Sequence, residues 1–136
     1  MTRSYLNKLT YSIVGAAIEV HKELGAGLVE SVYHKCLEKE FKLRNIRYSS
    51  EMQVNINYKG ETVVTGLRCD FLVEDAMVVE LKAVNGLIPV HEAQLLTYMK
   101  LLRKPKGILI NFNCGNIFAE GQRTYVNEYF RTIPER

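Results

Sequence analysis

Three charged residues near the middle of the chain have the types and spacing that metal-ion chemistry requires. Glu80 and Lys82 flank Leu81 within an apolar run, and Asp70 precedes them in the chain. Side chains two residues apart on a strand share a face and lie about 6.6 Å from one another, so Glu80 and Lys82 would point the same way. The simpler interpretation is an exposed Glu–Lys pair, which contributes about 0–1 kcal/mol.

A tight hairpin would bring Asp70 next to Glu80. If residues 74–76 form a three-residue loop, Val73 pairs with Met77, and counting back places Asp70 opposite Glu80. Two opposed carboxylates repel each other unless something positive lies between them. A hard cation with oxygen ligands would remove the conflict. A loop of two or four residues would instead place the two acids on opposite faces.

The same register predicts that Arg68 faces Lys82. Two opposed cations favour a nearby anion such as a phosphate, although both side chains could simply extend into solvent. Further along, His91, Gln94 and Tyr98 are spaced by three and four residues, which places them on one face of a helix. This polar face could border the site, with His91 and Arg68 as candidate phosphate contacts, or it could be an ordinary solvated face.

Another acid, Glu30, follows the break at Gly25-Ala26-Gly27, and we expect it in the first turn of a helix. A carboxylate is favourable there because of the helix dipole alone. The position by itself therefore indicates a helix start.

Apolar residues at steps of three and four predict helices that lead to and follow these side chains. The predicted helices are Ser4 to Leu24, Val29 to Leu43, and Val90 to Arg103, the last entered through Pro89. Alternating or continuous apolar runs predict strands. These strands are residues 53–58, Thr62 to Val73 with Gly66 as a candidate bulge, Met77 to Ala83, and Gly107 to Phe112.

The end of the chain has a weaker pattern. Ile117 to Ala119 could add a short strand, and Thr124 to Phe130 is ambiguous. The resulting order of two helices, three strands, a helix and a strand predicts an α/β or α+β sheet flanked by helices. The length of 136 residues suits one domain, 1–136.

Composition excludes several classes of protein. Hydrophobic residues make up 47% of the chain, which argues against disorder. The three cysteines are far apart without CxxC spacing, so we expect free thiols in a reducing cytoplasm rather than disulfides or a zinc site. We also expect no signal peptide and no membrane span, because long apolar runs are missing. The net charge of +3 permits binding to a polyanion without requiring it.

Four motifs, in this order and spacing, resemble a known family. The segment from Gly27 to Tyr33 resembles the pattern for which GxxExxY proteins are named, and Asn111-Phe112 also resembles that family. Asp70 followed by Glu80-Leu81-Lys82 resembles the D…(D/E)xK core of the PD-(D/E)XK nuclease superfamily, with Cys69 in place of the proline. Gln94 to Tyr98 resembles the QxxxY motif of RecB-type exonucleases. The resemblance extends from about Leu9 to Arg123.

The resemblance implies a restriction-endonuclease-like fold, in which helices cover both sides of a central mixed β-sheet. It implies that Asp70 and Glu80 bind Mg²⁺ or Mn²⁺, with the Leu81 carbonyl and Glu30 as further candidate ligands. Lys82 would orient or activate the attacking water. Gln94 and Tyr98 would position the site or the nucleic-acid backbone.

The sequence therefore predicts a metal-dependent nuclease that hydrolyses phosphodiester bonds, with DNA favoured over RNA. A catalytically silent module that binds nucleic acid or a protein is the alternative, favoured by the mild charge. Hydrolysis of a small phosphoester would use the same chemistry. Assembly is left open, but a domain of this size offers little surface to grip a duplex, so a homodimer is one possible state. Leu6 and Leu9 could serve that interface, but packing within their own domain is preferred.

Overall fold

Two long helices open the chain, as the apolar periodicity predicts. The computed structural model describes residues 1–136 and places α1 at Arg3–Leu24 and α2 at Glu30–Leu43. The Thr2 hydroxyl accepts a hydrogen bond from the Tyr5 amide (3.0 Å) at the start of α1. Gly25 ends the helix with a φ of 71°, which glycine adopts without strain. Both helix predictions are confirmed to within one residue at each end.

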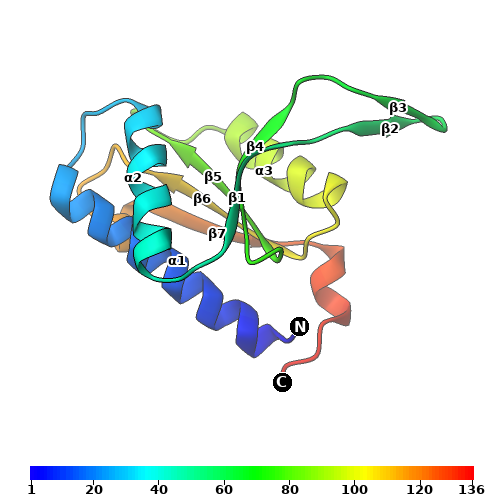
Figure 1. The fold of residues 1–136 in the computed structure, drawn as a ribbon, viewed down its shortest axis with the longest axis horizontal. Coiled ribbons are helices and arrows are strands. Elements are labelled where there is room, and N and C mark those ends of the chain that lie inside the picture. The colour runs from blue at the N-terminus through cyan, green and yellow to red at the C-terminus, as the bar shows by residue number, and fades with distance from the viewer.

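A five-stranded mixed sheet lies at the centre of the molecule, with its strands in the order β1-β4-β5-β6-β7 (Figure 1). The strands are β1 (Tyr48–Gln53), β4 (Arg68–Val73), β5 (Met77–Lys82), β6 (Lys106–Asn111) and β7 (Gln122–Val126). β5 and β6 run parallel, and the other neighbours are antiparallel. The strands predicted at Met77 and at Gly107 are confirmed, and β6 is buried along its whole length.

Helices cover both faces of this sheet. α1 and α2 contribute to a core on one face, and α3 (Pro89–Leu101) packs on the other face through Leu95 and Met99. Leu6 and Leu9 are 0% and 7% exposed and belong to the first core, which confirms that they pack within the fold. The predicted α/β class, with a restriction-endonuclease-like sheet between helices, is confirmed. None of the helices combines the length and the apolar character that a membrane span requires.

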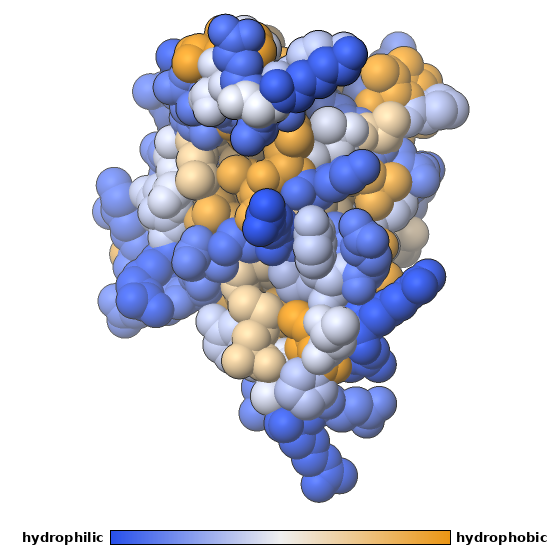
Figure 2. Space-filling model, turned by 90° about the vertical axis from the view of Figure 1, so that its right-hand side faces the viewer, coloured by the Kyte–Doolittle hydropathy of each residue, from blue (hydrophilic) through white to orange (hydrophobic).

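The strand predicted at residues 53–58 is wrong. β1 ends at Gln53, and after a break at residues 54–55 β2 (Ile56–Tyr58) pairs with β3 (Glu61–Val63) in a separate two-stranded arm. The second half of the predicted strand is therefore a strand, but it lies outside the sheet. The polar sequence of β1 has little intrinsic strand preference, so its pairing with β4 stabilises it. Figure 1 shows the arm extending away from the sheet. Figure 2 shows this side of the molecule, with hydrophobic residues toward the middle and hydrophilic residues around them.

The prediction of one continuous strand from Thr62 to Val73 is also wrong. Residues 64–67 separate β3 from β4, and Gly66 has a φ of 75° within this break. Gly66 therefore belongs to the connection between the arm and the sheet rather than to a bulge. The segment is exposed except for the partly buried Leu67, so no core contact keeps it extended.

The short strand predicted at Ile117 to Ala119 is wrong as well. The segment forms a short helical turn, η1 (Ile117–Gly121), which begins where the Asn116 side chain accepts the Ala119 amide at 2.8 Å. Strand β7 follows, and a second short helix, η2 (Glu128–Thr132), comes after it. Side-chain capping at Asn116 favours the helical turn over the extended conformation.

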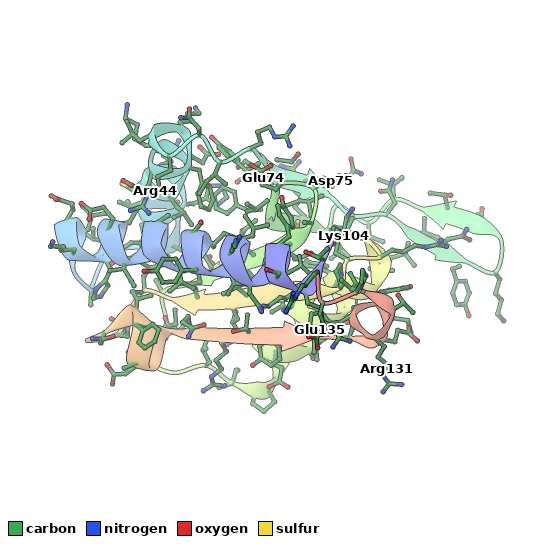
Figure 3. All side chains as sticks on the ribbon, turned by 90° about the horizontal axis from the view of Figure 1, so that it is seen from below. Arg44, Glu74, Asp75, Lys104, Arg131 and Glu135 are labelled. Atoms are coloured by element: carbon green, nitrogen blue, oxygen red, sulfur yellow. The ribbon has the colours of Figure 1, made fainter.

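Two ion pairs hold the loop between β4 and β5 (Figure 3). Glu74 accepts hydrogen bonds from the Arg47 amide at 2.7 Å and from its guanidinium at 3.0 and 3.1 Å. Asp75 accepts a hydrogen bond from Lys104 at 3.1 Å. Glu74 and Asp75 both have positive φ, 52° and 53°. These contacts tie a tight loop of unfavourable backbone conformation to its neighbours, and the loop sets the register of the hairpin.

Candidate functional site

The β4–β5 hairpin has the register that a three-residue loop predicts. Its pairs run from Val73 with Met77 at the loop to Phe71 with Val79 at the open end. The ladder stops there, one position before the two acidic residues. The predicted register is thus confirmed, and the two strands separate where the candidate site begins.

The carboxyl groups of Asp70 and Glu80 form hydrogen bonds across this open end. Glu80 Oε2 accepts a hydrogen bond from the Asp70 amide at 2.8 Å. Asp70 Oδ2 accepts one from the Leu81 amide at 2.7 Å. Each acid thereby satisfies a main-chain donor that no ladder bond reaches. The two carboxyl groups lie close together, as predicted, through side-chain bonds rather than through ladder pairing.

The prediction that Arg68 faces Lys82 is wrong, because both residues lie beyond the end of the ladder. Arg68 instead pairs with Gln53 of β1, and its side chain is exposed. Lys82 pairs with Asn111 of the parallel strand β6 and is half-buried. The anion site inferred from two opposed cations therefore has no basis in the hairpin register.

Strand β4 changes the face of the sheet that it contacts at Asp70. Phe71 packs in the core beneath α1 and α2, whereas Cys69, two residues earlier, packs in the core beneath α3. β1 changes face at the same level, where Glu51 has a φ of 51°. A left-handed conformation within a strand is uncommon for a residue other than glycine. The change of face lets the side chain of Asp70 emerge between the two layers.

Glu80 is the buried member of the acid pair, with 4% of its surface exposed. Burial, and next the negative charge of Asp70, raise the pKa of Glu80 to about 9, while the charge of Lys82 acts in the opposite direction. Burial, followed by the charges of Glu80 and Asp70, raises the pKa of the Cys69 thiol to about 12. A cation beside the pair would favour the ionised form of Glu80.

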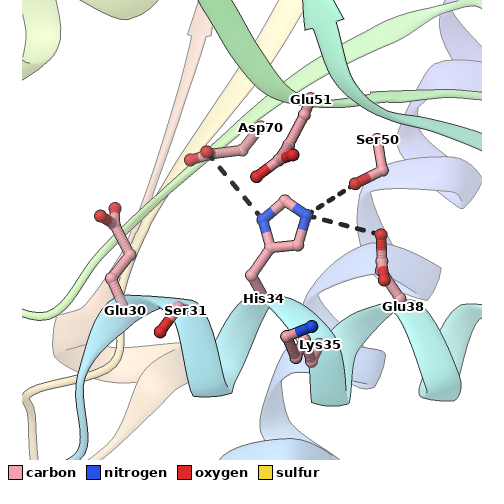
Figure 4. A pocket seen from close by; sticks show the side chains of 8 residues that line it. All are labelled: Glu30, Ser31, His34, Lys35, Glu38, Ser50, Glu51 and Asp70. Atoms are coloured by element: carbon pink, nitrogen blue, oxygen red, sulfur yellow. Dashed lines mark hydrogen bonds and ion pairs between the residues drawn. The ribbon is translucent and has the colours of Figure 1, made fainter.

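Asp70 borders a pocket on the α2 side that is lined only by polar and charged residues (Figure 4). The lining residues are Glu30, Ser31, His34, Lys35, Glu38, Ser50, Glu51 and Asp70. Burial and then the charge of Asp70 raise the pKa of Glu30, whereas Lys82 and His34 lower it. Glu30 therefore lies within electrostatic reach of the acid pair and is only partly shielded from solvent.

Tyr33, the last residue of the GxxExxY-like segment, has a structural role. Its hydroxyl donates to the Gly25 carbonyl at 2.6 Å and accepts from the Leu28 amide at 3.2 Å. Its ring stacks on Phe112 with 4.5 Å between the centroids. These contacts fix the loop that leads into α2, and thereby the position of Glu30.

α3 places Tyr98 near Glu80 on the other side of the site. Gln94 Nε2 donates a hydrogen bond to the Tyr98 hydroxyl at 3.2 Å, and Tyr98 is 3% exposed. Burial raises the pKa of Tyr98, and the charge of Glu80 raises it further while the bond from Gln94 lowers it. His91 Nδ1 accepts the Ile88 amide at 3.1 Å, so one of its ring nitrogens caps the start of α3.

Asn111 supports the turn that follows Lys82. Its Oδ1 accepts a hydrogen bond from the Val84 amide at 3.1 Å, and its Nδ2 donates to the Val84 carbonyl at 3.0 Å. Asn111 is 6% exposed. The asparagine of the GxxExxY-like pattern therefore holds the chain immediately after the lysine and need not contact a substrate.

Sequence reasoning missed six of the eight lining residues of the pocket, among them His34, Ser50 and Glu51. His34 follows Glu30 by four residues, and this spacing could have placed both side chains on one helix face. Ser50 and Glu51 lie in β1, a strand that the sequence did not predict, so no pattern indicated them.

A family model matches residues 7–124 of the chain, and it is the model of the PD-(D/E)XK nuclease superfamily. The chain belongs to this superfamily. No curated protein and no solved structure matches it significantly. Membership in the PD-(D/E)XK superfamily indicates a nuclease with a nucleic-acid substrate, and such nucleases generally use divalent metal ions.

The acid pair of this PD-(D/E)XK protein fits a hard divalent cation. Mg²⁺ is usually bound by one or two carboxylates, with water and substrate oxygens completing its shell. Asp70 and Glu80 provide two adjacent carboxyl groups, and the raised pKa of Glu80 reflects burial and the negative charge of Asp70. The chain contains no group of three or more His, Cys, Asp and Glu side chains arranged to hold a metal ion. In this arrangement the further ligands would be main-chain oxygens, water or substrate, and Glu30 would have to move toward the pair to serve as one.

Proposed function

We propose that the chain is a divalent-metal-dependent nuclease that hydrolyses phosphodiester bonds in nucleic acid. The observation that supports this most directly is the pairing of Asp70 with the buried Glu80 at the open end of the hairpin, with Lys82 nearby. Two ionised carboxylates held together in this way oppose folding unless one of them keeps a proton or a cation lies between them. Superfamily membership supports the same conclusion independently.

Asp70 and Glu80 hold the cation, Mg²⁺ or Mn²⁺, with the Leu81 carbonyl and Glu30 as additional candidate ligands. A bound divalent ion supplies a polarised phosphoryl oxygen and a more acidic water. The Leu81 amide fixes Asp70, and the Asp70 amide fixes Glu80, so both carboxylates are oriented before substrate arrives. Preorganised groups of this kind reduce the reorganisation that the transition state requires.

Lys82 adds positive charge beside the developing negative charge of the transition state, or orients the attacking water. Its charge lowers the pKa of both Glu80 and Glu30, so it lies within electrostatic range of each. Asn111 holds the chain that follows Lys82 and thereby limits the movement of its backbone.

Gln94 and Tyr98 would position the site from α3, where Gln94 donates to the Tyr98 hydroxyl and the charge of Glu80 contributes to the raised pKa of Tyr98. Arg68 is exposed and contacts phosphate as an ordinary surface cation, and His91 remains a weaker candidate because its Nδ1 caps α3.

DNA is the substrate that we favour, on the resemblance of Gln94 to Tyr98 to the RecB-type motif. Because the segment from Gly27 to Tyr33 resembles the GxxExxY pattern, we also propose that the chain is a protein of the GxxExxY family.

Two further properties are proposed on narrower grounds. The three free cysteines are compatible with a reducing cytoplasm. A homodimer would supply the surface that a duplex requires, although Leu6 and Leu9 are buried and cannot form its interface. The exposed arm of β2 and β3 is available for contacts with nucleic acid or with a second copy.

The test is cleavage of labelled single-stranded and duplex DNA and RNA by purified protein with Mg²⁺, Mn²⁺ or EDTA. We expect cleavage that requires metal, and a loss of about 10²-fold or more in Asp70→Asn, Glu80→Gln and Lys82→Ala. Lys39→Ala, on the exposed side of α2, is the matched control and should cleave normally. Equal cleavage by all variants would indicate contamination, and binding without cleavage would support the catalytically silent module instead.

A further inference from the structure

His34 lies beside Asp70 in the pocket and is held from two directions (Figure 4). Its ring stacks on Phe71, with 4.3 Å between the ring centroids and 17° between their planes. Its Nε2 lies 2.7 Å from the Ser50 hydroxyl oxygen. The side chain is 12% exposed. The ring therefore has little freedom to rotate away from its position.

The other ring nitrogen of His34 faces the acid pair. Nδ1 lies 4.0 Å from Asp70 Oδ1, while Asp70 Oδ2 accepts the Leu81 amide at 2.7 Å. The two oxygens of Asp70 thus have different surroundings: one is bonded to the main chain of β5, and the other is directed toward His34. Glu38 lies 3.6 Å from Nε2, on the Ser50 side of the ring, and leaves Nδ1 to Asp70.

We propose that His34 is a positioning residue that orients the Asp70 carboxylate for cation binding, and that Ser50 fixes His34 in turn. The proposal rests on the metal-dependent function proposed above. When Nδ1 carries the hydrogen, it points toward Asp70 Oδ1, and the Ser50 hydroxyl donates to Nε2. When a residue that hydrogen-bonds to a metal ligand is mutated, metal affinity commonly falls about 10–100-fold.

A purely structural role is the competing explanation, since the stacking on Phe71 alone could account for the buried ring. The two explanations differ in which part of the side chain matters. A phenylalanine retains a flat ring over Phe71 but has no hydrogen to offer Asp70. An asparagine loses the ring but places an amide nitrogen where Nδ1 stood, and a glutamine places one nearer to the position of Nε2.

The experiment is titration of full-length protein with Mn²⁺, by calorimetry and by the electron paramagnetic resonance of free Mn²⁺, at one pH. We expect His34→Phe and His34→Gln to weaken Mn²⁺ binding about 10–100-fold, and His34→Asn to remain within about threefold of wild type. Ser50→Ala should lose affinity to a smaller extent. Ser31→Ala, which alters the same pocket wall, is the control and should bind normally.

Melting temperatures without metal show whether each variant is folded, and His34→Phe should melt near wild type because it retains the stacking. Wild-type affinity in His34→Phe would overturn the proposal, and so would equal losses in His34→Asn and His34→Phe. A wild-type protein that binds no Mn²⁺ would overturn the proposed function itself, and this inference with it. The two failures are therefore distinguishable.

Discussion

Asp70 and Glu80 each complete the hydrogen bonding of the other's strand, at 2.8 and 2.7 Å, where the β4–β5 ladder has ended. Neither carboxyl group can turn away without leaving a main-chain amide unsatisfied, which costs about 1–3 kcal/mol when the amide is buried. The repulsion between the acids is thus opposed by two local bonds. The geometry of the pair is therefore present before any ligand binds, and the raised pKa of Glu80 is its measurable consequence.

Glu80→Gln should remove a pH dependence of stability. The pKa of Glu80 is raised from 4.5 to about 9 in the folded chain. Between these values the folded protein retains a proton that the unfolded chain releases, so the free energy of unfolding falls as the pH rises through this window. The contribution is at most about 1.4 kcal/mol per pH unit. Urea unfolding in EDTA at pH 5, 7 and 8.5 should show wild type losing stability relative to Glu80→Gln.

Metal should oppose this loss in wild type, because a cation binds the ionised form and stabilises the folded state. The increase in melting temperature with Mn²⁺ should be absent or much smaller in Glu80→Gln. Glu61→Gln, on the exposed arm, is the control and should preserve the wild-type pH profile. Parallel stability curves for wild type and Glu80→Gln would show that Glu80 is already ionised in the folded protein.

The positive φ of Glu51 predicts that glycine is the preferred replacement at this position. Glu51→Gly and Glu51→Ala both remove the carboxylate, so they differ only in the backbone. A left-handed conformation costs about 1–2 kcal/mol in an L-residue other than glycine. We expect Glu51→Gly to be more stable than Glu51→Ala by about 1 kcal/mol in denaturant unfolding. At Ser49, an exposed position of β1 without positive φ, the alanine variant should be the more stable of the two.

The part of the site that lies on the β4–β5 hairpin could be predicted from local sequence patterns, and the part on β1 could not. Loop length fixes hairpin register, so the approach of Asp70 to Glu80 could be predicted only on the assumption of a three-residue loop, which the structure confirms. The separation of the strands beyond Phe71 did not follow, and the prediction for Arg68 was wrong for that reason. The left-handed Glu51 has no sequence pattern, since neither glycine nor asparagine marks it. Ser50 could not be placed beside His34 until β1 was known.

Tyr33→Phe should weaken the loop before α2 while leaving the core packed. The phenylalanine retains the stacking on Phe112 but loses the bonds to the Gly25 carbonyl and the Leu28 amide. We expect a loss of about 1–2 kcal/mol in stability. Hydrogen exchange at the Leu28 amide should accelerate, and Mn²⁺ affinity should fall only if Glu30 is a ligand. Tyr11→Phe, at a residue 82% exposed, should leave stability and exchange unchanged.

Gly107→Ala should disturb the packing of α3, and with it the support for Tyr98. A Cβ at Gly107 would lie 2.7 Å from Met99 Sδ, closer than such atoms approach, and 3.0 Å from Leu95 Cδ1, so both side chains would have to shift. Overpacking of this kind typically costs about 1–3 kcal/mol. Shortening Met99 to alanine should make room for the added methyl group. We therefore expect the double variant Gly107→Ala/Met99→Ala to lose less stability than the sum of the losses of the two single variants. Gly86→Ala is the control because no atom lies within 4 Å of its added Cβ. Additive losses, measured by denaturant unfolding, would show that α3 moves as a unit and that the contact with Met99 does not limit its approach to the sheet.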